Sequence, residues 1–181
     1  TTGRAYTIYV VMEQAKPFLS AGQTIAIVGG DGAIGKACVE IARHYGKKYK
    51  IIKITKENLE NVYAADIIIS ATSSLNTIID PLRLKKNCIV IDAAKPSNIS
   101  RKYTRKDITI IDGGIVTVPG EISFGLDFDL GKNEMYACMA EPMILAMGGM
   151  KEDWIGTDFS LKKIEEIGRI GKKFGFSIKK C

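Results

Sequence analysis

Residues Thr24–Tyr45 read TIAIVGGDGAIGKACVEIARHY, and this stretch predicts a strand, a glycine-rich turn and a helix in succession. The run Thr24–Val28 is continuous, apolar and of strand length, as expected for a strand covered on both faces. From Ile34 to Tyr45 the apolar residues recur at helical spacing, and Gly46 is expected to end the helix. A strand that passes through glycines into a helix is an arrangement in which backbone amides can bind a phosphate group.

Two nucleotide-binding patterns compete for the glycine turn. The turn fits the dinucleotide pattern G-x-G-x-x-G from Gly30, and its looser relative G-x-x-G-x-x-G from Gly29. It also fits most of the triphosphate pattern G-x-x-x-x-G-K-S/T, but Ala37 stands where that pattern needs a hydroxyl for magnesium. We therefore predict NAD(P) rather than ATP, with a turn that binds no ligand as the alternative. The predicted contacts are Gly29, Gly30, Asp31, Gly32, Ala33, Ile34 and Gly35.

Apolar runs of strand length alternate with helical or loop segments at the spacing of a parallel sheet. Further strands are expected at Tyr49–Thr55, Asp66–Ala71, Cys88–Asp92 and Ile108–Ile111. Helices are expected at Tyr6–Leu19, which Pro17 bends or ends, and at Glu57–Ala64, Glu134–Met147 and Leu161–Phe174. We predict an α/β fold, namely a Rossmann-type, doubly wound, mostly parallel sheet with flanking helices. Residues 1–181 are expected to form a single NAD(P)-binding domain.

The composition is that of a globular protein. Of the 181 residues, 46% are hydrophobic, and the apolar runs are too short to span a bilayer. No charged-then-apolar signal segment opens the chain. Four cysteines without a C-x-x-C pair and a single histidine give no support to a zinc site or a disulfide framework. We expect the reducing cytoplasm as the compartment.

The charge is moderately basic. A net charge of +6 comes from 26 Lys and Arg residues against 20 Asp and Glu residues. Most lysine clusters are expected to be solvated helix ends, and a surface for an anionic partner is the functional alternative. No basic stripe interleaved with aromatic residues supports nucleic-acid binding.

Residues after the predicted strands bear on the cofactor and its position. An acidic residue about twenty residues beyond the glycine turn would favour NAD. This chain has Thr55 and Lys56 there, which suit the 2′-phosphate of NADPH, and Glu57 one step later; a solvated Lys56 is the alternative. Because ligands collect at the carboxyl ends of strands, Ser70–Ser74 (SATSS) and Ala93–Pro96 (AAKP) are expected to border the nicotinamide unless they are ordinary turns. The predicted contacts are Ala71, Thr72 and Ser73, with Gly113 and Gly114 allowing close backbone approach.

Distinctive segments run in one order along the chain. They are TTG (Thr1–Gly3), YTIYVVMEQ (6–14), VGGDGAIG (28–35), ADIII (Ala65–Ile69), IVIDAAKPSNI (Ile89–Ile99), IIDGGIV (Ile110–Val116), MYACMAEPMIL (Met135–Leu145) and IEEIGRIGKKFGF (Ile164–Phe176). Together they resemble the long-chain acyl-(acyl carrier protein) reductases of cyanobacteria, which reduce fatty acyl thioesters to aldehydes with NADPH. The resemblance implies NADPH as cofactor and acyl carrier protein or acyl-CoA as substrate carrier. It covers the family's C-terminal, cofactor-binding part, so we expect the acyl-binding region to be absent.

The resemblance also implies a catalytic cysteine. In that family the cysteine of the A-C-x-A-E motif is the nucleophile, and here it falls on Cys138. Its thiolate would attack the acyl thioester and form an enzyme-bound thioester before reduction. Without the resemblance, the residue pattern favours a buried structural thiol. Glu134 and Glu141 flank Cys138 and would raise its pKa, helix amides would lower it, and Glu141 could instead shuttle a proton.

One residue departs from the family pattern. Pro142 follows Glu141, where the reductases carry a small hydroxyl residue. It would either kink a helix that contains it or begin a helix, which would leave Cys138 in the preceding loop. The sequence leaves this open, as it does the acyl chain length, the carrier and a homo-oligomeric state.

Two rival functions also stay open. One is a shikimate-dehydrogenase-like NADP oxidoreductase with direct hydride transfer and no covalent intermediate. The other is a non-catalytic NAD(P)-binding module. Loss or retention of activity without Cys138 separates the covalent mechanism from the first rival.

Overall fold

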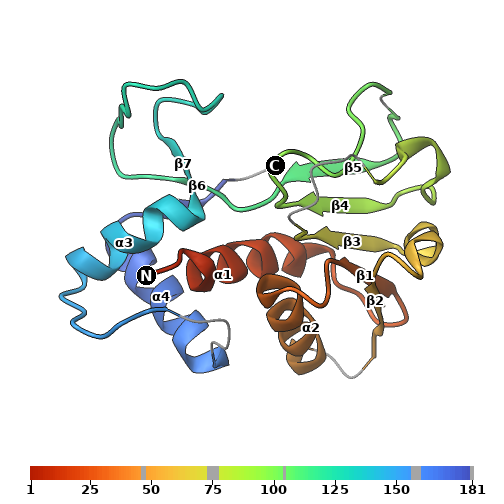
Figure 1. Cartoon of the computed structure of the whole chain (residues 1–181), viewed down its shortest axis with the longest axis horizontal. Coiled ribbons are helices and arrows are strands. Elements are labelled where there is room, and N and C mark those ends of the chain that lie inside the picture. The colour runs from red at the N-terminus through yellow and green to blue at the C-terminus, as the bar shows by residue number, and fades with distance from the viewer. Residues whose placement is uncertain (46–47, 73–77, 104, 156–159, 180–181) are drawn as a thin grey trace. The chain divides into compact units, whose positions relative to one another are not determined.

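The computed structural model describes residues 1–45, 48–72, 78–103, 105–155 and 160–179 (Figure 1). The chain divides into two compact units. Unit 1 combines Thr1–Glu13 with Gly114–Cys181, and unit 2 is Gln14–Gly113. The glycine turn and the parallel strands, on which the expectation of a nucleotide-binding domain rests, therefore lie in unit 2.

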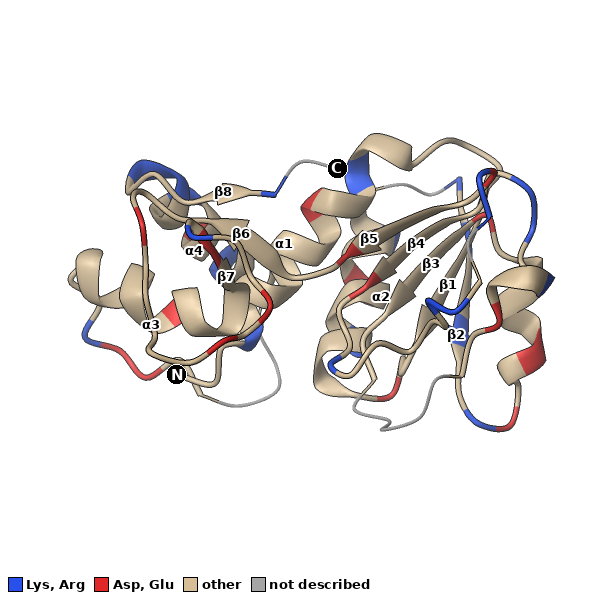
Figure 2. Ribbon diagram, turned by 90° about the horizontal axis from the view of Figure 1, so that it is seen from above, with Lys and Arg blue, Asp and Glu red and all other residues tan. Residues whose placement is uncertain are grey.

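Unit 2 is built on a five-stranded parallel sheet in the order β2-β1-β3-β4-β5 (Figure 2). In this register Ala26 of β1 lies between Ile52 of β2 and Ile68 of β3. The central strand β3 is buried along its whole length, which is why its sequence is a continuous apolar run. The structure confirms the five predicted strands: β1 (Thr24–Val28), β2 (Lys50–Ile54), β3 (Ile67–Ser70), β4 (Ile89–Asp92) and β5 (Thr109–Asp112).

Helical connections cover both faces of this sheet. The chain runs from β1 through α2 (Ala33–Tyr45) to β2, and then through η2 (Leu59–Ala64) to β3 on the other side of β1. Right-handed crossovers in opposite directions place these two connections on opposite faces. Val62 of η2 belongs to the core of one face, with Ile68 and Val90 of the strands. The remaining connections of unit 2 include the 3-10 helices η1 (Lys16–Phe18) and η3 (Pro81–Arg83).

The connection after β2 differs from the predicted helix Glu57–Ala64. It is a 3-10 helix that begins only at Leu59. The cause is Asn58, whose side chain accepts a hydrogen bond from the backbone N–H of Thr55 (2.7 Å) and donates one to the carbonyl of Lys53 (2.9 Å). An asparagine that bonds to nearby backbone in this way stabilises a turn at the expense of helix.

The strand order reverses at β1, which has β2 on one side and β3 on the other. An open parallel sheet with connections on both faces is the Rossmann-type doubly wound fold, so the predicted fold class is confirmed. In such sheets ligands bind in the crevice outside the carboxyl ends of the strands that flank the reversal. Here those strands are β1 and β3.

Unit 1 holds a three-stranded antiparallel sheet, in the order β7-β6-β8, and helices. Helix α1 begins in this unit, and its last two residues, Gln14 and Ala15, fall in unit 2. Gly171 of α4 allows a close approach to α1, because a Cβ there would come 2.9 Å from the Tyr6 hydroxyl. The elements are α1 (Arg4–Ala15), β6 (Ile115–Thr117), β7 (Glu134–Tyr136), α3 (Ala137–Met147), α4 (Leu161–Lys173) and β8 (Ser177–Ile178).

The predicted helix Glu134–Met147 is wrong in its first three residues. These form β7, which pairs with β6, and α3 begins at Ala137 after an extended Tyr136 (φ −69°, ψ 139°). Pro142 lies inside α3, so Cys138 is the second residue of a helix and does not lie in a loop before it. In the part of the chain that the structure describes, no helix is both long enough and apolar enough to cross a membrane.

Candidate functional site

The glycine turn of unit 2 connects β1 to α2 at the strand reversal. Gly29 has φ +77°, and a Cβ there would come 2.8 Å from the Cβ of Thr72, in the loop after β3. A Cβ on Gly35 would overlap the Gly29 carbonyl oxygen and come 2.8 Å from Gly30 Cα. The turn therefore requires glycine at both ends. Because Gly29 has no side chain, the loops after β1 and β3 can lie against each other.

The start of α2 presents backbone amides at this crevice. The first N–H groups of a helix have no partner within it, which here concerns Ala33, Ile34 and Gly35, while Lys36 N donates to Gly32 O at 2.9 Å. Such amides, with the positive end of the helix dipole, can bind a pyrophosphate. Ala37 is buried and carries no hydroxyl, so the turn lacks the magnesium ligand of a triphosphate site.

The carboxyl end of β2 carries both signs of charge. Thr55 Oγ1 donates to the Glu57 carboxylate, and this bond is the main reason why the pKa of Glu57 lies below its ordinary value. Asp31 of the glycine turn forms an ion pair with Lys53 of β2. Lys56 is exposed beside them. A ligand phosphate at this edge would meet two lysines and two carboxylates, whereas the prediction rested on Thr55 and Lys56.

A buried network of hydrogen bonds joins the loop after β3 to the loop after β4. Asp92 is 1% exposed, and its carboxylate accepts hydrogen bonds from Ser97 Oγ (2.6 Å) and the backbone N–H of Asn98 (2.9 Å). Asn98 Nδ2 donates to Ser70 Oγ at 3.0 Å and to the Thr72 carbonyl at 3.4 Å. Among the described residues no donor reaches Asn98 Oδ1, although the side chain is fully buried. The network therefore joins the loops that follow β3 and β4 at the carboxyl ends of these strands.

The other predicted cofactor contacts are divided between the two units. Ala71 N donates to the Val28 carbonyl at 3.1 Å, which places Ala71 at the reversal beside Thr72, and Ser73 lies outside the described residues. Gly113 belongs to unit 2, where a Cβ on it would come 2.7 Å from Ala93 N. Gly114 belongs to unit 1, where its carbonyl accepts from the N–H of Ala137 at 2.7 Å. Gly114 thus supports the start of α3.

Cys138 occupies the first turn of α3 and is exposed. The pKa of its thiol lies above the ordinary value for cysteine, chiefly through partial desolvation and further through the charge of Glu141. The backbone amides of Met139 and Cys138 act in the opposite direction and favour the thiolate. Glu134 lies on β7 and forms an ion pair with Lys179 at 2.9 Å. The cysteine is therefore a protonated thiol at neutral pH, with amides in place to stabilise its anion.

Glu141 is fully buried one turn after Cys138. Its Oε1 accepts hydrogen bonds from Thr1 Oγ1 and from the backbone N–H of Gly3 (3.0 Å). Its Oε2 accepts from the backbone N–H of Tyr6 at 2.7 Å. The carboxylate thus accepts hydrogen bonds from backbone N–H groups at the N-terminal end of α1.

Alkylation of the native protein with iodoacetamide should label Cys138 and leave Cys38 and Cys88 unlabelled. Both of these thiols are buried, and burial raises the pKa of each to about 12. Because the pKa of Cys138 is raised as well, its labelling rate should keep increasing at pH values where a free cysteine is already fully ionised. Peptide mapping across a pH series measures this. Labelling of Cys38 at the rate of Cys138 would contradict the burial described.

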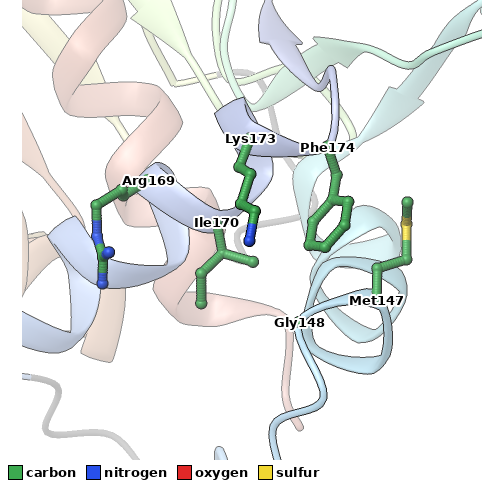
Figure 3. A pocket seen from close by; sticks show the side chains of 6 residues that line it. All are labelled: Met147, Gly148, Arg169, Ile170, Lys173 and Phe174. Carbon is green, nitrogen blue, oxygen red and sulfur yellow. The ribbon is translucent and has the colours of Figure 1, made fainter.

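A small cavity of about 170 Å³ lies between the ends of α3 and α4 (Figure 3). Met147 and Gly148 line it from the end of α3, and Ile170, Lys173 and Phe174 from α4 and its end. Cys138 is in the opposite, first turn of α3. The cavity is therefore separate from the thiol.

Several residues that shape these sites were not among those predicted from the sequence. Gly3 of the TTG segment packs on Cys138, and Asp92 and Asn98 brace the crevice. A signal for Asp92 was present, because it ends an apolar strand on the side where ligands bind. No spacing links Gly3 to Cys138, since the two are brought together by folding.

These features define a class: a Rossmann-type doubly wound unit with a glycine turn of the dinucleotide-binding form, in one chain with an exposed cysteine at a helix start. No protein-family model matches the chain. Over 97% of its length the chain is 28% identical to the long-chain acyl-(acyl-carrier-protein) reductase of Synechococcus elongatus, which confirms the resemblance. It is also 30% identical, over 77% of its length, to the aminotransferase PigE of a Serratia species. The chain spans 61% of the reductase and 17% of PigE.

Two solved structures with a similar arrangement are distant in sequence. A Trypanosoma brucei methylenetetrahydrofolate dehydrogenase-cyclohydrolase has a TM-score of 0.47 at 19% identity, over 58% of this chain and 41% of that one. The nucleotide-binding domain of glutamyl-tRNA reductase from Thermoplasma volcanium has a TM-score of 0.37 at 20% identity, over 57% of this chain and 84% of that one.

Proposed function

We propose that the chain takes part in the NADPH-dependent reduction of an acyl thioester to an aldehyde, through a thioester on Cys138. The observation that carries this proposal is an exposed cysteine, at the start of α3 and with backbone amides that favour its thiolate. The likeness to an acyl-(acyl-carrier-protein) reductase along 97% of the chain supports the assignment. Because the chain spans 61% of that enzyme, we propose that it supplies the cofactor-binding and thiol-bearing part.

The crevice of unit 2 fits a dinucleotide. A Cβ would fill the space at Gly29 and Gly35, so backbone amides can approach a pyrophosphate closely. The amides of Ala33 and Ile34 would hold the pyrophosphate, and Thr55 and Lys56 would face the 2′-phosphate. Within the described part of the chain Asn98 Oδ1 has no donor, which supports a ligand donor, such as a carboxamide, at the loops after β3 and β4. When bound, NADPH supplies the hydride that releases the acyl group as an aldehyde.

Cys138 performs the first chemical step. Its thiol loses a proton to solvent, and the sulfur attacks the carbonyl carbon of the acyl thioester. A new C–S bond to Cys138 forms, the C–S bond to the carrier breaks, and the carrier thiol leaves after protonation. The amides of Cys138 and Met139 stabilise the thiolate, and they can donate to the oxyanion that develops on the carbonyl. The raised pKa makes this step faster as the pH rises through the thiol pKa.

The same likeness supports a proposal for the carrier of the acyl group. We propose acyl carrier protein or coenzyme A, and the net charge of +6 suits either anionic carrier. A reduced thiol at Cys138 is required throughout, so we assign the reaction to the cytoplasm.

Replacement of Lys56 by alanine is expected to weaken NADPH binding by about two- to fivefold and to leave NADH binding unchanged. An exposed lysine that faces a phosphate contributes at most about 1 kcal/mol. Lys50→Ala is the matched control, because Lys50 is exposed at the start of β2 whereas Lys56 follows the end of that strand. Titration of cofactor fluorescence measures both affinities. Equal losses for NADPH and NADH would show that Lys56 does not select the 2′-phosphate.

The direct test is mass spectrometry of the protein after incubation with a long-chain acyl-CoA and no reductant. We expect one acyl group, mapped by proteolysis to Cys138 and removed by hydroxylamine. Prior treatment with iodoacetamide should prevent the adduct. An unmodified Cys138 in protein that also binds NADPH would favour the non-catalytic module.

A further inference from the structure

The N-terminal segment lies directly on the helical turn that carries Cys138. Gly3 is buried and has φ +73°. A Cβ on Gly3 would come 2.5 Å from the Cβ of Cys138 and 2.7 Å from its carbonyl oxygen. Only a residue without a side chain fits here, so any change in the path of this segment would displace Cys138.

Glu141 fixes the path of that segment. Its carboxylate accepts from the N–H of Gly3 and from the N–H of Tyr6, the third residue of α1. The first turn of α1 contains no acidic residue of its own. A carboxylate from α3 therefore takes the place of a capping side chain, with the negative charge that a helix N-terminus favours.

The first turn of α3 needs this external support. Pro142 has no N–H to donate to the carbonyl of Cys138, so this turn lacks a helical hydrogen bond. Tyr136, which precedes the helix, provides no side-chain cap. The packing of Gly3 on Cys138, and the bonds that Glu141 accepts from Gly3 and Tyr6, restrain α3 where this helical hydrogen bond is missing.

We propose that Glu141 is a positioning residue: through Gly3 and the first turn of α1 it fixes the first turn of α3 and hence the direction of the Cys138 thiol. This inference rests on the proposed role of Cys138 as the nucleophile. It replaces proton transfer as the role of Glu141, because the side chain is fully buried and both of its oxygens already accept hydrogen bonds. The TTG segment is thereby part of the thiol site.

The test is the rate at which Cys138 is acylated by acyl-CoA, followed by mass spectrometry. Glu141→Gln places an NH2 group against a backbone N–H, and Gly3→Ala inserts a methyl group onto Cys138. Each is expected to slow acylation on the order of 10- to 100-fold, as displacement of a reacting group does. Glu165→Gln on the exposed face of α4 is the matched control and should acylate at the wild-type rate.

Two further readouts separate positioning from a general loss of structure. Trp154 is the single tryptophan and is buried in unit 1, so unchanged fluorescence shows that this unit is folded. The pH midpoint of iodoacetamide labelling of Cys138 should move to lower pH in Glu141→Gln, which removes a negative charge. It should not move in this way in Gly3→Ala.

The outcomes are distinguishable. Slow acylation of both folded variants supports positioning, and a double variant no slower than the slower single variant would show that both act through one contact. Slow acylation of Glu141→Gln with wild-type rates in Gly3→Ala would overturn the inference in favour of proton transfer. Wild-type rates in both would overturn it outright. Absence of acylation in the wild-type protein would instead reject the proposed function itself.

Discussion

Replacement of Cys138 by alanine is expected to lower aldehyde formation from an acyl thioester by at least about 10³-fold, the scale of losing a covalent nucleophile. The change removes one exposed sulfur and leaves the helical turn able to form, since alanine is the best helix former. NADPH affinity should stay at the wild-type value, because the substitution leaves the residues of the glycine turn unchanged. Aldehyde release and cofactor fluorescence are the two measurements.

The control for this substitution is Cys88→Ala, which removes a buried thiol from unit 2. It should cost some stability and leave aldehyde formation per folded molecule unchanged. Full activity in Cys138→Ala would exclude the covalent mechanism and support direct hydride transfer, as in the shikimate-dehydrogenase-like alternative. The acyl adduct should vanish in parallel with activity, because both depend on the same sulfur.

Replacement of Gly35 by alanine is expected to weaken NADPH binding at least tenfold and to destabilise the protein by about 1–3 kcal/mol, as overpacking does. The new methyl group would overlap the carbonyl oxygen of Gly29 and come 2.8 Å from Gly30 Cα. All of these atoms are backbone, so no side chain can rotate to relieve the overlap. The glycine turn must move away from α2, and the amides of the first turn then lose their aim at the pyrophosphate. Urea unfolding and cofactor titration measure the two effects.

Gly32→Ala is the matched control in the same turn. Its Cβ would have the Gly29 carbonyl oxygen as nearest neighbour, at 3.3 Å, and Gly32 does not have a positive φ. We expect this variant to bind NADPH much more tightly than Gly35→Ala. Equal affinity of Gly35→Ala and the wild-type protein would contradict the turn as the pyrophosphate site.

The parallel sheet could be predicted because the pattern that indicates each strand lies within a short stretch of sequence. Each strand is a continuous apolar run, and β1 is followed by glycines that only a strand-to-helix turn requires. The short strands of unit 1 could not be found in the same way. Thr117 of β6 pairs with Glu134 of β7 and Ser177 of β8, so its partners lie far along the chain and the strands are too short to show alternation. The helical spacing of the residues after Tyr136 then extended the predicted helix too far towards the N-terminus.

The phosphate-binding and reactive residues of the candidate site could be predicted, but the residues that hold them in position could not. The glycine turn stands out as a motif, because phosphate-binding loops demand particular residue types. Cys138 was predicted from the resemblance to the reductases, since its own residue pattern favours a buried structural thiol. The environment of Glu141 depends on backbone N–H groups of Gly3 and Tyr6, which every residue except proline carries. Backbone partners of this kind cannot be recognised from the residue types in the sequence. The same holds for Asn98, whose bond to the Thr72 carbonyl joins two loops through a backbone atom.

The division of the chain also has a consequence for synthesis on the ribosome. Unit 2 is one continuous segment, Gln14–Gly113, whereas unit 1 needs Thr1–Glu13 together with Gly114–Cys181. The five-stranded parallel sheet of unit 2 can therefore fold while the later part of the chain is still being translated. Thr1–Glu13 must wait, because their unit is complete only once Ser177 of β8 has been translated. Before that point the bond between Gly3 and Glu141 lacks the support of the complete unit, so we expect the Cys138 thiol of a nascent chain to be less restrained than in the folded unit.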